Sequence, residues 1–168
     1  MNISDTLLPE FDMEMANTRK MLERVPEDKF GWRPHAKSMT LGELATHLTN
    51  LPSWVAITLT TTSFNFDPED PAQRDTLLTS RQAMLEQFDA HVATGRAAIA
   101  AASDAEWMQS WALQVKGRTI FNIPRIAVLR GFVLSHTIHH RAQLGLYLRL
   151  NDIALPPVYG PTADEGMM

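Results

Sequence analysis

Residues 124–150 read PRIAVLRGFVLSHTIHHRAQLGLYLRL, and this stretch does most to decide the fold class. Apolar residues recur in it at the three- and four-residue intervals of an amphipathic helix. Pro124 suits the first turn of such a helix, where its missing N–H group leaves no hydrogen bond unmade. The spacing therefore predicts a helix over 124–150 with one face in a core.

The same period predicts three further long helices, over residues 4–25, 40–61 and 75–102. Thr40 and Glu43 have the spacing of a capping box, which marks the start of the second helix. Pro52 lies inside that helix, so we expect a kink or an early end near Leu51. Residues 62–74 are rich in proline and acidic side chains and predict a long loop, whereas residues 111–117 fit a short extended hairpin.

Four amphipathic helices of this length favour an all-α fold, a four-helix bundle formed by one domain over residues 1–168. The connections after the second and third helices are long, which predicts crossover connections rather than a minimal up-and-down bundle. A hydrophobic fraction of 45% and a charged fraction of 20% are ordinary for a globular protein.

Charge and composition exclude several classes of function. The net charge is −4 and the basic residues never form a run, which argues against a nucleic-acid partner. The chain has no cysteine, so it has no disulfide, no thiolate ligand and no cysteine nucleophile. The first residues lack the pattern of a signal peptide, and the apolar stretches are too short to span a membrane. We therefore expect a cytoplasmic protein without a membrane partner.

Two histidines of the last helix point toward its apolar side. His136 and His140 are four residues apart, so at about 100° per residue they project within about 40° of each other. The same stripe contains Leu129 and is flanked by Phe132. An unpartnered polar ring in the interior costs about 1–3 kcal/mol, and one shared metal ion would satisfy both rings. The alternative is that each ring bonds a backbone carbonyl or lines a wet pocket.

A third metal ligand must come from another helix. His47 is the best candidate, because its stripe also contains Leu51 and faces inward. His35 lies in a predicted loop and His91 at the margin of an apolar face, so both are expected to be solvated. His139 is expected to face a neighbouring helix or solvent.

Trp54, Gln143 and Tyr147 are candidates for a substrate pocket beside the metal, although single residues in such positions more often belong to a core. The sequence contains neither an H-E-x-x-H motif nor a phosphate-binding or dinucleotide-binding glycine motif. It also lacks the paired E-x-x-H elements of a di-iron bundle.

The string HTIHHRAQL at 136–144, followed by YLR at 147–149, resembles the signature of the DinB/YfiT-like family. LGELATH at 41–47 is similar to the second-helix element of that family, and WRP at 32–34 to the approach to it. Order and spacing agree over nearly the whole chain. One departure is Ala142, which stands where glycine is common after the arginine.

The resemblance implies an up-down-down-up four-helix bundle. It also implies a three-histidine metal site open to solvent or substrate, with His47, His136 and His140 as ligands. Known members include transferases and isomerases that depend on low-molecular-weight thiols, and many members have no assigned reaction. DNA binding is not implied.

The first hypothesis for function is a metal-dependent enzyme, such as a thiol-dependent transferase or isomerase. We expect one divalent ion, zinc first, with nickel and iron as alternatives. Three protein ligands with an open position are typical of catalytic zinc, and the nucleophile would be metal-bound water or thiolate. The substrate would be a small molecule, with a low-molecular-weight thiol as possible cosubstrate.

Two alternatives use the same site. One is a metal-bearing binding or stress-response module without turnover. It is favoured because no carboxylate can be assigned as a general base: Glu43 lies one turn before His47, but its role in the capping box already accounts for it. A metal-dependent hydrolase is the other. A metal-free bundle acting through dimerisation of a helix face is a third reading, and a homodimer is also compatible with the enzyme.

Overall fold

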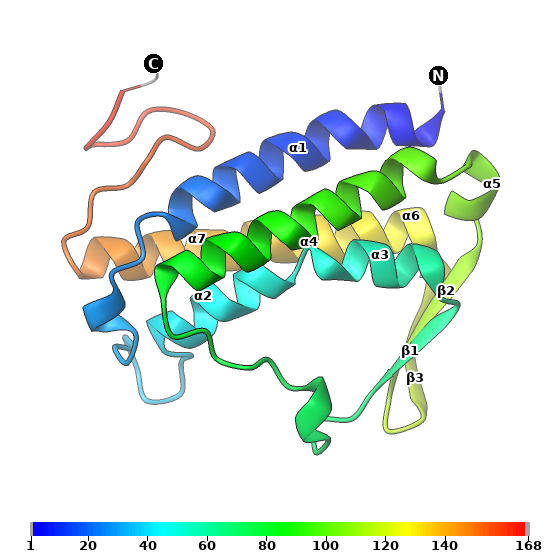
Figure 1. Cartoon of the computed structure of the whole chain (residues 1–168), viewed down its shortest axis with the longest axis horizontal. Helices are drawn as coiled ribbons and strands as arrows, with labels where there is room; N and C mark the ends of the chain where they lie inside the picture. The colour runs from blue at the N-terminus through cyan, green and yellow to red at the C-terminus, as the bar shows by residue number, and fades with distance from the viewer. Residues whose placement is uncertain (1, 167–168) are drawn as a thin grey trace.

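The computed structural model describes residues 2–166, which form a mainly helical chain with a small sheet (Figure 1). The helical elements, in chain order, are α1 (Ile3–Leu22), the 3₁₀ turn η1 (Glu27–Lys29), α2 (Leu41–Asn50), α3 (Ser53–Thr60), the 3₁₀ turn η2 (Pro71–Gln73), α4 (Arg81–Ala101), α5 (Asp104–Trp107), α6 (Arg125–Ala127), the π-helical segment η3 (Val128–Ser135) and α7 (His136–Leu150). The strands are β1 (Ser63–Phe66), β2 (Ser110–Val115) and β3 (Arg118–Pro124).

The long helical segments lie side by side around a shared core. In Figure 1, α1 leads away from the N-terminus, and α2, α3 and α4 run back in the opposite direction. The segment from η3 through α7 then runs again in the direction of α1. Helix α4 packs on α1, α2 and α3, while α7 packs on α1 and α2. Among the described helices, none combines the length and the apolar character that a bilayer span requires.

The helix predicted over 40–61 is divided into α2 and α3. Its start is as predicted: the Thr40 hydroxyl accepts a hydrogen bond from the Glu43 amide at 3.1 Å, and Glu43 accepts one from the Thr40 amide at 2.6 Å. The break falls at Leu51 and Pro52, because proline has no N–H group to continue the helical ladder. The two halves can therefore present His47 and Trp54 along different axes.

The chain is not all-α, and this corrects the prediction from the sequence. The expected hairpin is present as β2 and β3, which turn through Lys116 (φ 49°) and Gly117 (φ 78°). Strand β1, within the predicted loop 62–74, pairs in parallel with β2, for example Ser63 with Ala112. A four-residue strand whose partner is some fifty residues away in the chain has little local signal, which explains why it was missed.

Two predicted helix boundaries also move. The helix predicted from residue 75 begins at Arg81, where the Ser80 hydroxyl caps it by accepting from the Ala83 amide at 3.1 Å. Residues 75–80 instead continue the loop. The helix predicted over 124–150 is a composite, in which α6 and the π-helical η3 precede α7. The π-helical turns end immediately before His136, and such segments are frequent at functional sites.

A charged pair lies inside the apolar core and joins α7 to α1. The Arg141 guanidinium donates to the Glu14 carboxylate at 2.6 Å, and both side chains are at most 4% exposed. It also donates to the Glu14 carbonyl at 2.9 Å and to the Thr18 hydroxyl at 3.1 Å. The Tyr159 hydroxyl donates to Glu14 at 2.8 Å and contacts Arg141, so the C-terminal segment is tied to the same network.

We predict that Glu14→Ala lowers the free energy of unfolding by about 3–5 kcal/mol, because it leaves the buried Arg141 charge without its partner. The control is Asp12→Ala, which breaks the exposed Arg96 pair between α1 and α4 and should cost about 1 kcal/mol or less. Urea denaturation measures both. The double variant Glu14→Leu with Arg141→Met should be less destabilised than Glu14→Ala. Equal losses for Glu14→Ala and Asp12→Ala would contradict the importance of the buried pair.

Candidate metal centre

The three histidines expected to bind a metal lie together in the folded chain. His47 comes from α2, and His136 and His140 come from successive turns of α7. The Nε2 atom of His136 is 3.3 Å from Nε2 of His47 and 2.9 Å from Nε2 of His140. One ring nitrogen from each of the three lies within 4.8 Å of the other two. These distances show that the Nε2 atoms converge on one point between α2 and α7. All three rings are partly buried.

The opposite nitrogens of two of these rings are held by polar partners. Nδ1 of His47 lies 3.4 Å from Asp75 Oδ2, and Nδ1 of His140 lies 2.7 Å from Gln143 Oε1. An acceptor at Nδ1 fixes the proton there and leaves the Nε2 lone pair free. Asp75 is itself held by Asn50, which donates to Oδ1 at 2.6 Å and accepts from Gln87 of α4 at 2.5 Å. The rings are therefore oriented before any ligand binds.

The surroundings keep the His136 and His140 rings neutral and Asp75 charged. Burial, together with the nearby His140 and His47 rings, lowers the pKa of His136 to about 4. Burial also lowers the pKa of His140, although the hydrogen bond with Gln143 opposes the change. Burial acts to raise the pKa of Asp75, but hydrogen bonds from His47 and Asn50 outweigh it and the net shift is downward. At neutral pH, His136 and His140 thus have lone pairs available without losing a proton.

This set of donors fits a divalent transition metal. Neutral imidazole nitrogens are suited to zinc, copper, iron and nickel. Two nitrogen ligands of a tetrahedral zinc ion are about 3.3 Å apart, close to the 3.3 and 2.9 Å observed here. Without a cation, lone pairs of partly buried rings face one another. Three histidines leave at least one coordination position for another molecule, which is the composition of catalytic zinc sites.

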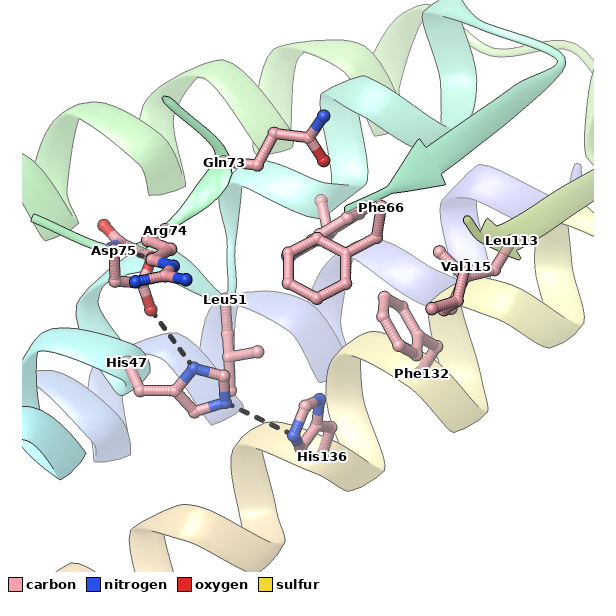
Figure 2. A pocket seen from close by; sticks show the side chains of 12 residues that line it. His47, Leu51, Phe66, Gln73, Arg74, Asp75, Leu113, Val115, Phe132 and His136 are labelled. Carbon is pink, nitrogen blue, oxygen red and sulfur yellow. Dashed lines mark hydrogen bonds and ion pairs between the residues drawn. The ribbon is translucent and has the colours of Figure 1, made fainter. Parts of the chain in front are cut away.

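A pocket of about 430 Å³ opens beside the histidines, and Figure 2 shows its lining. Its lining includes His47, Asn50, Leu51, Trp54, Phe66, Gln73, Arg74, Asp75, Leu113, Val115, Phe132 and His136. Polar side chains gather around His47, while Phe66, Leu113, Val115 and Phe132 gather on the other side. The apolar wall is built from the sheet and η3. Its size is that of a small-molecule site.

The three remaining histidines lie outside the cluster. Nδ1 of His35 accepts from the Lys37 amide at 3.2 Å in an exposed turn. Nδ1 of His91 is paired with the Thr49 carbonyl at 3.1 Å, so a backbone group already satisfies it. His139 is exposed and its ring lies edge-on to His140, with centroids 4.9 Å apart.

The three side chains suggested for a substrate pocket have different positions. Trp54 lines the pocket and contacts Phe64 and Phe132 edge-on. Gln143 instead orients His140. Tyr147 is buried at 8% exposure against Trp32, with ring centroids 5.5 Å apart, and is not among the residues that line the pocket.

Sequence reasoning missed Asp75, Arg74 and the apolar wall. Asp75 was assigned to the first turn of a helix, where an acidic residue is commonplace. Arg74 and Phe66 fell in the predicted loop, which has no periodicity to indicate direction. The one available signal was the length of that loop, because long loops in small domains often carry functional residues.

The sequence model of the DinB superfamily matches residues 10–144, most of the chain, including all three clustered histidines. The chain belongs to the DinB superfamily. A relative of this DinB protein is the uncharacterized protein YrdA of Bacillus subtilis, which is 25% identical over 161 residues, covering 96% of this chain and 90% of YrdA.

Two solved structures resemble this DinB protein in fold. A DinB-like protein of Bacillus cereus gives a TM-score of 0.73 at 18% identity, with 94% of this chain and 98% of that chain covered. The DinB-like protein YjoA of Bacillus subtilis gives 0.70 at 16% identity, with 96% and 99% covered. The likeness shows that the mainly helical fold is shared.

We predict that His47→Ala, His136→Ala and His140→Ala each weaken metal binding by more than about tenfold, because each removes one of the converging Nε2 atoms. The matched controls His35→Ala, His91→Ala and His139→Ala should retain the metal. Elemental analysis of protein purified without a histidine tag measures the metal content. Equal loss for His139→Ala and His136→Ala would rule out this set of ligands.

Removing the partner of His47 should weaken binding less than removing the ring itself. We predict that Asp75→Ala lowers zinc affinity by about 10–100-fold, because the His47 ring loses the acceptor that orients it. Asp75→Asn, which can still accept through its amide oxygen, should lie between wild type and alanine. Competition with a chromophoric chelator measures the affinity, and Asp28→Asn, at an exposed site on η1, controls for net charge. Unchanged affinity in Asp75→Ala would mean that Asp75 does not support the site.

Proposed function

We propose that this DinB protein is a metal-dependent enzyme that acts on small molecules, and that its reaction is a transfer or isomerisation that uses a low-molecular-weight thiol. The observation that carries the proposal is the convergence of three Nε2 atoms beside a pocket of about 430 Å³, which His47 and His136 line. A structural metal site is closed by four protein ligands. Three ligands next to a substrate-sized pocket favour catalysis instead.

Each part of the site has a role in this proposal. His47, His136 and His140 would hold the ion, with zinc preferred over nickel or iron. When bound, the ion would lower the pKa of a water or thiol that coordinates it. Asp75 and Gln143 fix the ring tautomers, so the three nitrogens present lone pairs together. The apolar wall and Trp54 would exclude water and hold the apolar part of a substrate.

The thiol would have to come from a second small molecule, since the chain has no cysteine. The resemblance of its histidine motifs to those of thiol-dependent members supports this reaction class. The superfamily match alone does not select it, because one fold supports many reactions.

A second candidate is a metal-bearing binding module without turnover. Asp75 is the one carboxylate among the described residues that line the pocket, and its two oxygens are bonded to His47 and Asn50. It is therefore poorly placed to remove a proton from a bound substrate. The same observation disfavours a hydrolase that needs a free carboxylate as general base.

We assign α1, α2 with α3, α4, and η3 with α7 to the four helices of an up-down-down-up bundle, forming one domain. We also propose that the protein acts in the cytoplasm, as a homodimer, and without a nucleic-acid partner.

The test is cobalt substitution followed by addition of a small thiol. We predict that millimolar thiol at about pH 8, near its ionisation, produces an intense near-ultraviolet charge-transfer band. His140→Ala should show no such band. A conjugation assay with several small thiols and electrophiles then measures turnover. Metal with a band but no turnover would favour the binding module, and an unchanged cobalt spectrum would remove the basis for the thiol reaction.

A further inference from the structure

The pocket is divided into a charged end and an apolar end. His47, Arg74 and Asp75 lie together at one end, whereas Phe66 and Phe132 lie at the other (Figure 2). Leu113 and Val115 from β2 also line the apolar end. A ligand that fits both ends must itself be amphipathic, with an apolar group several bonds away from its polar group.

Arg74 is the one side chain with a permanent positive charge among the described residues that line the pocket. Its Nε donates to the Pro68 carbonyl at 2.9 Å, which anchors the side chain to its own loop. Its two terminal NH₂ groups make no hydrogen bond or ion pair with the described residues. The guanidinium therefore keeps both of its outer donors, which are the pair that binds a carboxylate in bidentate fashion.

The neighbouring negative charge does not neutralise Arg74. Asp75 follows it directly in the chain, yet both carboxylate oxygens of Asp75 are turned to His47 and Asn50.

We propose that the pocket selects a small amphipathic carboxylate: Arg74 binds the carboxylate group, and the apolar part of the molecule lies between Phe66 and Phe132. Arg74 is then a specificity-determining residue. The inference deepens the proposed function and rests on it only in placing the reacting group near the three histidines. Recognition of the carboxylate is a property of Arg74 and does not depend on the metal.

The experiment compares a carboxylate with its neutral amide of the same shape. Isothermal titration calorimetry with hydrocinnamate and hydrocinnamide is performed on the full chain, both stripped of metal and loaded with zinc. We expect hydrocinnamate to bind about tenfold more tightly than hydrocinnamide in both forms, as for one charge-assisted bidentate contact. Arg74→Gln should remove this preference, and Arg74→Lys should retain part of it.

The control is Arg118→Gln, which removes the same charge from β3 at a residue outside the pocket lining and should leave the preference unchanged. A preference for hydrocinnamate that survives in Arg74→Gln would overturn the proposal, because the carboxylate would then be bound by another group, such as the zinc ion. Failure of wild type to bind either compound would also overturn it. Metal content and thiol turnover are measured separately, so loss of the proposed function and loss of this preference can be told apart.

Discussion

The position of α7 depends on the ion pair between Arg141 and Glu14, which is buried among apolar side chains and supported by Thr18 and Tyr159. Two opposite charges so deeply buried are stable only in a geometry that satisfies their hydrogen bonds, and this restricts the rotation and height of α7 against α1. Arg141 immediately follows His140. The constraint that fixes the helix in the core therefore also directs His136 and His140 toward α2, where His47 completes the cluster.

The rest of the pocket depends on the break between α2 and α3, on the loop from β1 to α4 and on the sheet. The break at Pro52 lets α2 carry His47 while α3 carries Trp54, and the loop from β1 to α4 brings Arg74 and Asp75 to the pocket. Strand β2 closes the apolar end. The long helices thus position the three clustered histidines, while the loop and the sheet shape the volume beside them.

The charged and neutral groups of the site suit both the proposed metal binding and the proposed recognition of a carboxylate. Burial keeps His136 and His140 neutral and ready to coordinate, while hydrogen bonds keep Asp75 ionised behind His47. Asp75 therefore orients the His47 ring, and its two paired oxygens are poorly placed for acid–base chemistry on a substrate. Arg74 is left as the free charge at the pocket. The arrangement favours recognition of an anion near a metal over hydrolysis by a side-chain base.

The sequence by itself determined what depends on local periodicity and short motifs: the long helices, the capping box at Thr40, and the inward direction of His47, His136 and His140. These follow because a helix of regular pitch converts spacing into direction. The tertiary structure alone decided where β1 pairs, that Glu14 is the partner of Arg141, and that Arg74 and Asp75 reach the histidines. Those contacts join residues far apart in the chain, from 28 positions for His47 and Asp75 to 127 for Glu14 and Arg141, so no local pattern encodes them.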